Sequence, residues 1–453
     1  MYRRSLVNLT KLIYQDLIKA KTDSRLPMRP LSNTSNLILP TIQDLKSKET
    51  KKLGIDHGYK PVPTDRSYLT KYLPKQEDLP PRSMQDSFLE GTIPLSSNDI
   101  LQEKYITFLG HVRIGRLLED MDIFAVLVAY KHIYAPTLPD DIASPYTLVT
   151  AAVDQIDFTD FVPKPNEDIK LSGHVSWVGR SSMEVVVWLE QMQHGTWHKI
   201  TRALFLIAAR DATCKKAAVV NQLVPCNDYE KQMLESGVSR KNRRRKNMQE
   251  HVSKVVPTAE EQQMIHDLYM STVKEDDLSA TSTKFPGGLV AMEKCTISNV
   301  IFSHPEDRNL HNTVFGGFIM RNATELAWIL GFQYSKYRPY LRSISDISFD
   351  TAIAVNSLIQ MEAVVNYSHL NFYQIIVFVK VLDPVKGQAS KTNTFHFTFE
   401  SPDRVKQVYP KSYHEAMLYV DGKRHFDLVM SGDHGSKVGD LIEKYKSNLV
   451  SKL

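Results

Sequence analysis

The sequence predicts an α+β protein made of two tandem copies of one unit, in which an antiparallel sheet wraps around a long helix. The first observation is a repeat. Blocks 91–215 and 285–402 each begin with a polar loop that ends in glycine and leads into an apolar helix of about five turns. The second observation is the order of elements: each helix is followed only by strand-like runs. A doubly wound parallel sheet would need further helices between those strands.

In the first block the glycine-ended loop is His111–Gly115. The helix after it has an apolar stripe with helical spacing, formed by Leu117, Leu118, Met121, Ala125 and Val128. Strand-like runs follow at 146–158, 170–178, 183–190 and 199–210. These elements predict one helix packed against one sheet.

The second block repeats the pattern after the loop His311–Gly317. Its helix presents Phe318, Ala323, Leu326, Ala327 and Leu330, and its strand-like runs cover 341–349, 358–367, 373–382 and 391–400. In the last run, aromatic residues alternate with polar ones, as in a strand with two different faces. Local matches support the repeat: Ile156-Asp157-Phe158 with Ile347-Ser348-Phe349, Trp177 with Tyr367, and Met183–Val185 with Tyr373–Ile375.

Two polar stretches lie outside the blocks. Residues 22–90 are rich in Pro, Lys, Ser and Asp and are expected to form an extended lead-in. Residues 216–284 form a linker that contains a basic run, Lys241–Lys246. We expect this run to be solvated, since no aromatic residues interleave it as nucleic-acid binding would require. Later in the linker a helix is predicted from Thr258, which with Glu261 matches a capping box.

The two ends of the chain carry possible targeting signals, or addresses, for different compartments. Residues 1–21 hold five basic residues against one acid and have a helical apolar stripe. This pattern is typical of a mitochondrial transit peptide, although an ordinary surface helix has it too. The C-terminal extension, 403–453, ends in Ser451-Lys452-Leu453, a peroxisomal address. We expect the mitochondrial matrix, with the peroxisome as the alternative.

The composition excludes several classes. The 453 residues are 42% hydrophobic and 24% charged, which is the balance of a globular protein, and no apolar run is long enough to span a membrane. A net charge of +5 is too small to argue for nucleic acid. The three cysteines show no disulfide framework or zinc spacing, and the fifteen histidines show no metal-binding motif. No metal site is therefore predicted.

Several longer stretches carry a family resemblance: Gly173–Gly179, Phe315–Phe318, Phe395–Phe399 and Met417–Gly422. They resemble the hot-dog thioesterase superfamily and, more narrowly, the mitochondrial acyl-CoA thioesterases of type 9, over about residues 80–430. The resemblance implies two tandem hot-dog domains that hydrolyse acyl-CoA to free acid and CoA. It implies homo-oligomers with sites between hot-dog units, and no cofactor, since CoA is part of the substrate.

Thioester hydrolysis needs a carboxylate that activates water or attacks directly. Asp122 is the best candidate. It lies seven residues after Gly115, too deep in the helix to act as a cap, and its neighbours are apolar. The resemblance also puts it at the catalytic acid position of the hot-dog family. The alternative is a partly exposed aspartate that forms a salt bridge at the helix edge.

The resemblance implies that the acid of one unit faces the loop of the other, so Asp122 would face the second loop. There Asn312 would orient the water or the thioester carbonyl. The N–H groups of Gly316 and Gly317, at the start of a helix, would stabilise the developing oxyanion. Both glycines also fit a second role in close packing of the helix against the sheet.

Two neighbours of Asn312 are supporting candidates. For His311 the alternative is a structural role, as a loop residue that is hydrogen-bonded to backbone. The loop amide of the family aligns closer to Thr313 than to Asn312, so the role of the asparagine stays open.

In the second helix the position that corresponds to Asp122 is Thr324, with Glu325 one residue later. A shift of one residue turns a side chain by about 100° around a helix, so Glu325 is not expected to do the work of Asp122. Both residues are supporting candidates only. We expect one functional site in each chain.

The turn Gly179-Arg180-Ser181 is the candidate for contacts with the phosphates or adenine of CoA. A simple turn between two strands explains the same residues. Rival functions are a hot-dog protein that binds acyl-CoA without hydrolysis, and an acyl-CoA hydratase. A hydratase usually pairs an Asp with a His, and the sequence shows no such pair at the two helix starts.

Overall fold

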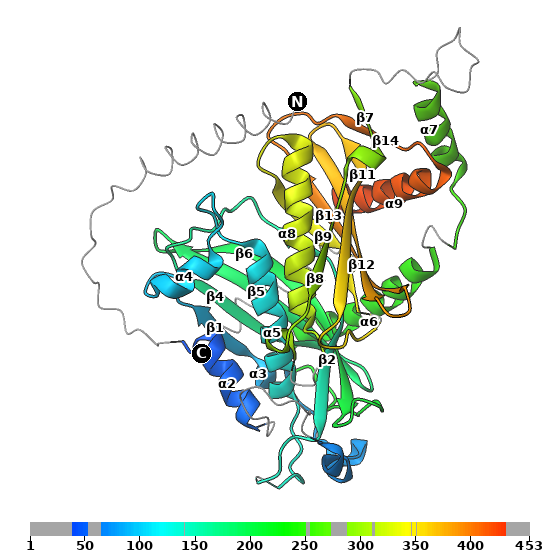
Figure 1. The fold of residues 1–453 in the computed structure, drawn as a ribbon. Coiled ribbons are helices and arrows are strands. Elements are labelled where there is room, and N and C mark those ends of the chain that lie inside the picture. The colour runs from blue at the N-terminus through cyan, green and yellow to red at the C-terminus, as the bar shows by residue number, and fades with distance from the viewer. Residues whose placement is uncertain are drawn as a thin grey trace.

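The computed structural model describes residues 39–52, 65–139, 141–250, 254–272, 288–309, 313–345, 347–349 and 351–431. In this part of the chain, two similar units join edge to edge (Figure 1). Both predicted addresses, residues 1–21 and Ser451-Lys452-Leu453, lie outside the described residues. Among the described helices, none is both long and apolar enough to cross a membrane.

The first unit has the helix and all four strand runs that the sequence predicts. Its elements are β1 (Leu89–Ile93), α4 (Asp99–Tyr105), α5 (Ile114–His132), β2 (Tyr146–Val153), β3 (Ile156–Phe158), β4 (Ile169–Val178), β5 (Ser182–Gln193) and β6 (Thr196–Asp211). The run predicted at 146–158 is broken into β2 and β3, and β1 was not predicted.

The second unit repeats this order. Its elements are β7 (Leu289–Ala291), β8 (Thr296–Phe302), α8 (Gly316–Ser335), β9 (Tyr340–Ser345), β10 (Ile347–Ser348), β11 (Leu358–His369), β12 (Phe372–Asp383), β13 (Gln388–Glu400), β14 (Gln407–Tyr409) and α9 (Tyr413–Met430). The predicted run 341–349 is likewise split in two, and β8 is the unpredicted counterpart of β1.

One antiparallel sheet of 12 strands runs through both units. Its main order is β1-β4-β5-β6-β3-β9-β13-β12-β11-β8, while β2 pairs with β6 and β10. The units meet where β3 pairs with β9, at Ile156 and Ile344, and where β10 pairs with β2, at Ile347 and Val153. Outward from this seam, the order β6-β5-β4-β1 in the first unit corresponds to the order β13-β12-β11-β8 in the second.

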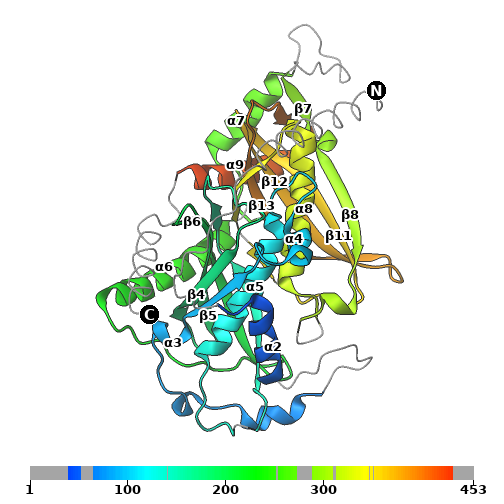
Figure 2. The same ribbon diagram turned by 90° about the vertical axis from the view of Figure 1, so that its left-hand side faces the viewer.

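The long helices α5 and α8 lie side by side on one face of this sheet (Figures 1 and 2). The core lies between them and the strands. It includes the fully buried Phe124 of α5 and the inward-facing Phe395, Phe397 and Phe399 of β13. A long helix held against an antiparallel sheet, twice in one chain, is the tandem hot-dog arrangement that the sequence predicts.

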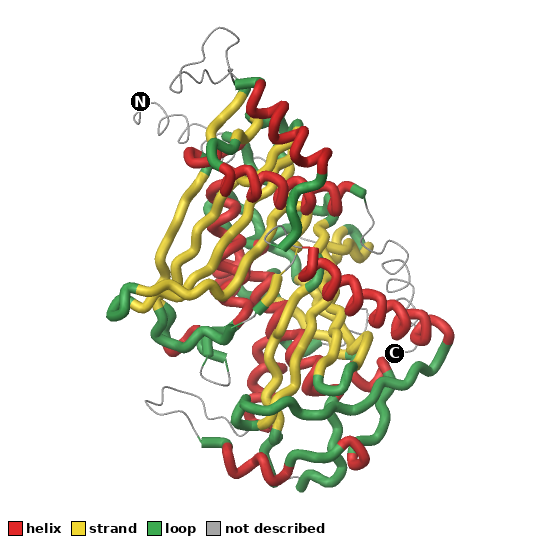
Figure 3. Tube along the Cα trace, turned by 90° about the vertical axis from the view of Figure 1, so that its right-hand side faces the viewer, coloured by secondary structure: helices red, strands yellow, loops and turns green. Residues whose placement is uncertain are grey.

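Two further helices cover the opposite face of the sheet (Figure 3). They are α6 (Asp228–Glu250) on the first unit and α9 on the second. A Cβ on Gly237 of α6 would lie 2.5 Å from the Trp177 ring, and one on Gly422 of α9 would lie 2.7 Å from Tyr367. Trp177 and Tyr367 follow β-bulges in equivalent strands, so their predicted match is confirmed.

The basic run of the linker belongs to α6, and the expectation that it is solvated is wrong for part of it. Arg244 pairs with Asp154 at 2.7 Å and with Glu184 at 3.2 Å. One turn earlier, the buried Arg240 also pairs with Glu184. These ion pairs fix α6 to the sheet. The helix predicted after Thr258 is also present, as α7 (Ala259–Met270), with the predicted capping box.

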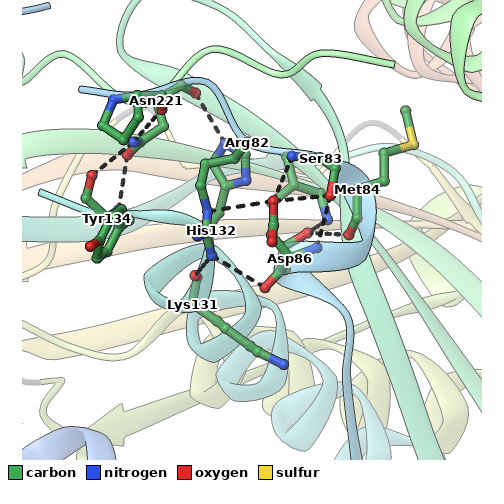
Figure 4. Close-up of polar contacts among 11 residues, drawn as sticks. Arg82, Ser83, Met84, Asp86, Lys131, His132, Tyr134 and Asn221 are labelled. Carbon is green, nitrogen blue, oxygen red and sulfur yellow. Dashed lines mark hydrogen bonds and ion pairs between the residues drawn. The ribbon is translucent and has the colours of Figure 1, made fainter. Parts of the chain in front are cut away.

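The lead-in is not extended throughout, because it contains α2 (Ile42–Lys52) and α3 (Met84–Ser87). Ile42 and Met84 join the core, which the proline-rich composition did not indicate. The same segment helps to close the end of α5 (Figure 4). His132 hydrogen-bonds the Asn221 carbonyl at 3.0 Å, and the Asn221 amide donates to the carbonyls of Pro80 and Tyr134 at 2.8 Å.

Candidate active site

Asp122 lies on α5 where this helix faces the start of α8, and its side chain is 0% exposed. The residues around it on the helix, Leu118, Met121 and Ala125, are buried too. The alternative of a partly exposed aspartate at the helix edge is therefore wrong. A charged group at such a place is costly unless it is hydrogen-bonded or used in chemistry.

Both carboxylate oxygens of Asp122 accept a hydrogen bond. The Thr150 hydroxyl on β2 donates to Oδ1 at 2.6 Å, and the Gly317 N–H donates to Oδ2 at 2.8 Å. The second bond joins the two units, because Asp122 belongs to the first helix and Gly317 to the second. The structure thus brings the predicted acid and the predicted glycine turn together.

Burial raises the pKa of Asp122 to about 6, and the hydrogen bonds from Thr150 and Gly317 oppose this rise. At neutral pH the group is therefore mostly ionised, yet it takes up a proton readily. A pKa close to the working pH is what a general base needs.

The two glycines let α8 approach α5 closely. A Cβ on Gly317 would lie 2.5 Å from the Phe315 ring and 2.9 Å from Glu119 Cα. A Cβ on Gly316 would lie 3.2 Å from Asp122 Oδ2. The glycines thus serve close packing, as the alternative to an oxyanion role proposed, but Gly317 packs against the helix α5 and not against the sheet. The same packing brings the start of α8 to the carboxylate.

A cavity of about 510 Å³ adjoins Asp122 and is called here the acid pocket. Its walls come from both units and include Thr150, Thr313, Gly316 and Phe349. Three basic residues also line it, namely Lys46 of α2, Arg210 of β6 and Arg308. The volume is in the usual range for small-molecule sites. The basic residues offer contacts for an anionic group, although five carboxylates line the same wall: Glu49, Glu119, Asp122, Glu306 and Asp307.

The predicted loop residues are only partly visible. His311 and Asn312 lie outside the described residues. Thr313 lines the acid pocket and exchanges hydrogen bonds with Asn309: the Asn309 amide donates to its hydroxyl at 2.7 Å, and its N–H donates back at 3.2 Å. The roles of all three loop residues stay predictions.

A second cavity, of about 530 Å³, lies where the start of α5 meets the middle of α8. It is called here the apolar pocket. Thr324 and Glu325 line it, together with the loop residues Arg113 and Gly115. The Thr324 hydroxyl donates to Met320 O of its own helix at 2.7 Å, and Glu325 pairs with Arg113 at 2.5 Å. Neither residue makes the contacts of Asp122.

The turn Gly179-Arg180-Ser181 joins β4 and β5, away from both pockets. Within the turn, Gly179 N–H donates to Ser182 O at 2.8 Å. The other two carbonyls accept from outside it, Ser181 O from Ala209 N–H at 2.8 Å and Arg180 O from Val220 N–H at 3.3 Å. None of the three turn residues lines the acid pocket or the apolar pocket. Their role in binding CoA stays a prediction.

One group of described residues has the side chains of a metal site. His396 of β13 and His425 and Asp421 of α9 are buried, and their ligand atoms lie within 4.8 Å of one another. His396 alternates along β13 with Phe395 and Phe397, which face α8, so this group lies on the other face of the sheet from Asp122.

Sequence reasoning missed Thr150, Lys46 and Arg210. Thr150 and Thr147 are the two polar residues of an otherwise apolar strand, which is a signal that could have drawn attention to Thr150. Its partner is 28 residues away, so no local pattern links the two. Lys46 lies in the stretch that was expected to be an extended lead-in.

No protein family model matches the chain. The human mitochondrial acyl-coenzyme A thioesterase 9 is 39% identical over 382 residues, which are 84% of this chain and 86% of the human protein. The mouse mitochondrial acyl-coenzyme A thioesterase 10 is 38% identical over 364 residues, 80% of this chain and 82% of that protein. A mitochondrial acyl-coenzyme A thioesterase 4 from Humulus lupulus is 30% identical over 370 residues, 77% of this chain and 68% of the plant protein.

Solved structures show a weaker likeness. An acyl-CoA hydrolase from Staphylococcus aureus, in complex with butyryl coenzyme A, is 22% identical and covers 35% of this chain and 99% of its own, with a TM-score of 0.33. This likeness is too low to bear on the site, so the family assignment rests on the relatives in sequence. Since the human and mouse relatives are 38–39% identical over at least 80% of both chains, the chain belongs to the family of the acyl-coenzyme A thioesterases 9 and 10.

Proposed function

We propose that this protein hydrolyses acyl-CoA thioesters to a free carboxylic acid and CoA, with Asp122 as base or nucleophile. As a base, Asp122 takes a proton from the water whose oxygen attacks the carbonyl carbon. The carbon–sulfur bond then breaks, and the sulfur of CoA leaves with the proton. As a nucleophile, Asp122 attacks the carbonyl carbon itself, and the carbon–sulfur bond breaks as the thiolate of CoA leaves. Water then hydrolyses the resulting anhydride, which releases the acid and supplies the proton that the thiolate takes up. The reaction needs no cofactor, since CoA enters as part of the substrate.

The observation that carries the proposal is the buried carboxylate of Asp122, which accepts hydrogen bonds from Thr150 and Gly317 beside a cavity. These two donors hold the carboxylate in one orientation. Its pKa of about 6 leaves it ionised and basic at neutral pH. A buried carboxylate with a fixed orientation and a shifted pKa is typical of a catalytic site.

The thioester oxygen needs a donor, and the Gly317 N–H is already used by Asp122. We therefore assign the oxyanion contact to the N–H of Gly316, which lines the same pocket at the positive end of α8. Asn312 keeps its predicted role of orienting water or the carbonyl. For the phosphates of CoA we propose Lys46 and Arg210 of the acid pocket. The turn Gly179-Arg180-Ser181, which lies outside this pocket, stays the second candidate.

The test is release of free thiol from saturated acyl-CoA substrates of increasing chain length. We expect thiol release with at least one chain length, because hydrolysis does not depend on a double bond. A hydratase would leave saturated substrates intact, and a pure binding protein would bind them without releasing thiol; either result would refute the proposal. Label found in the Asp122 carboxylate after one turnover in water labelled with heavy oxygen identifies a nucleophile, because a general base does not exchange its own oxygens.

We also propose a mitochondrial location, in the matrix, because the relatives in sequence are mitochondrial proteins and residues 1–21 have the composition of a transit peptide. The C-terminal Ser451-Lys452-Leu453 keeps the peroxisome as the alternative. Fluorescent tags on each terminus in turn separate the two, because each tag blocks one address. A homo-oligomer, as the resemblance implies, is checked by sedimentation of the whole chain.

A further inference from the structure

The apolar pocket stands at the place that mirrors the acid pocket. The acid pocket lies where the start of α8 meets the middle of α5, and the apolar pocket lies where the start of α5 meets the middle of α8. The strand β2 borders the first, as β9 does the second. The two volumes, about 510 and 530 Å³, are nearly equal. The second copy of the site has thus kept its cavity.

The chemistry of hydrolysis has not been kept there. Thr324 replaces the acid, and its hydroxyl is bound to its own helix. Leu341 replaces Thr150, since each stands six residues before the matched Ile347 and Ile156. Glu325, the carboxylate one residue later, pairs with Arg113. Among the described residues of this pocket, none makes the two contacts that hold Asp122.

The walls of this pocket favour an aliphatic chain. They include Phe158, Phe161, Ile200, Trp328 and Ile329. Of the three arginines that line it, Arg113 pairs with Glu325 at 2.5 Å, Arg342 pairs with Glu400 at 2.6 Å, and Arg338 lies over the Tyr340 ring. Two of the three arginine charges are therefore balanced by carboxylates of the same wall. At the mouth, Phe108 is 63% exposed and Ile329 is 46% exposed. Apolar side chains gathered around an open cavity indicate a place where an apolar group binds.

We propose that the apolar pocket binds the acyl chain of a second ligand, either acyl-CoA or the fatty acid released from it, without hydrolysing it. The choice of an acyl chain rests on the proposed function, because the mirrored pocket would receive the same group. Trp328 is the one tryptophan of four that lines this pocket, so its fluorescence reports occupancy. The acid pocket has no tryptophan in its wall.

The experiment titrates the Asp122→Asn variant, which cannot consume the ligand, with dodecanoyl-CoA, dodecanoic acid and CoA, and follows Trp328 fluorescence. We expect both ligands with an acyl chain to change the fluorescence and CoA alone to leave it constant. A second variant, Ile329→Arg, puts a charge at the mouth and should weaken binding by about tenfold or more. Ile100→Arg is the matched control, since Ile100 is 77% exposed on α4 and lines neither pocket.

The proposal is overturned if no ligand with an acyl chain changes the fluorescence, or if Ile329→Arg and Ile100→Arg bind alike. It is also overturned if the ligand-free protein sediments as an assembly that Ile329→Arg alone dissociates, because a second copy of the chain then covers the pocket. Thiol release by the unmodified protein is scored separately. Activity without a change in fluorescence refutes only this proposal, whereas a response to dodecanoic acid without activity refutes only the proposed function.

Discussion

The two pockets between the units have the same framework and different polar groups. In each, the glycine-ended start of one long helix meets the middle of the other helix. In the acid pocket these parts bring Asp122, Thr150 and the N–H of Gly317 together. In the apolar pocket the corresponding side chains are Thr324 and Leu341, and no carboxylate is held in the same way.

This difference teaches that shape and chemistry are set by different residues. The cavity follows from how two helices pack on one sheet, so it survives in both copies. The chemistry depends on two side chains and one backbone donor, and changes at those positions remove it. The comparison leads to three predictions, in which the same kind of change is made in each pocket.

The largest difference is expected between Asp122→Asn and Glu325→Gln. We expect Asp122→Asn to lower kcat about a thousandfold, because an amide neither accepts the proton nor attacks. Glu325→Gln should change kcat less than about threefold, since that carboxylate pairs with Arg113 in the apolar pocket. The measurement is thiol release under saturating acyl-CoA. Comparable losses in the two variants would mean that both pockets are active.

Stability provides the control for this experiment. Burial raises the pKa of Asp122 from 3.8, its value in the unfolded chain, to about 6 in the folded protein. At a pH between these two values, the carboxyl group is protonated in the folded state and ionised in the unfolded state. The free energy of unfolding therefore falls as pH rises from about 4 to about 6, and above this range the ionised group destabilises the fold. Asp122→Asn avoids this cost and should be more stable at pH 7 by up to about 3 kcal/mol, but not below pH 4. Urea denaturation at the two pH values checks this.

The repeated pattern of helix and strands was sufficient to predict both units, because alternation and apolar stripes are local signals. Asp122 was found for the same reason: a charge deep in an apolar helix is visible in the sequence. Thr150 was not, because its contact with Asp122 depends on how β2 lies beside α5. The helix α2 was missed because prolines on both sides hide a helix whose order comes from packing on the core. The edge strands β1 and β8 are short and lie next to polar segments, so their pairing is also a tertiary effect.

The second prediction compares the glycines at the two helix starts. In Gly317→Ala the new Cβ would lie 2.5 Å from the Phe315 ring and 2.9 Å from Glu119 Cα, so α8 must move away from Asp122. We expect kcat to fall about a hundredfold and the unfolding free energy to fall by about 1–3 kcal/mol. In Gly115→Ala the nearest atom, Arg321 O, would be 3.1 Å away, so both effects should be smaller.

Thiol release measures the kcat of the two glycine variants, and urea denaturation measures their unfolding free energy. Equal losses of activity would show that the start of α5 matters as much to the reaction as the start of α8. That result would break the distinction between the two pockets.

The smallest effect concerns the hydroxyl that one pocket has and the other lacks. Thr150→Val keeps the shape of the side chain but removes the donor to Asp122 Oδ1. A buried carboxylate that loses a hydrogen bond is harder to ionise, so its pKa should rise above the present value of about 6. Less of the base is then ionised at pH 7, and kcat/KM should fall about tenfold there.

The profile of kcat/KM against pH separates this cause from simple misfolding. A raised pKa moves the acidic limb of the profile to higher pH, so part of the lost rate returns as the pH is increased, whereas damage to the fold lowers the rate equally at every pH. Leu341→Thr adds the matching hydroxyl to the apolar pocket and should leave the limb in place, since no carboxylate there depends on it. If Thr150→Val lowers the rate without moving the limb, Thr150 positions Asp122 but does not change its pKa. The Thr150 hydroxyl would then not be an electrostatic difference between the two pockets.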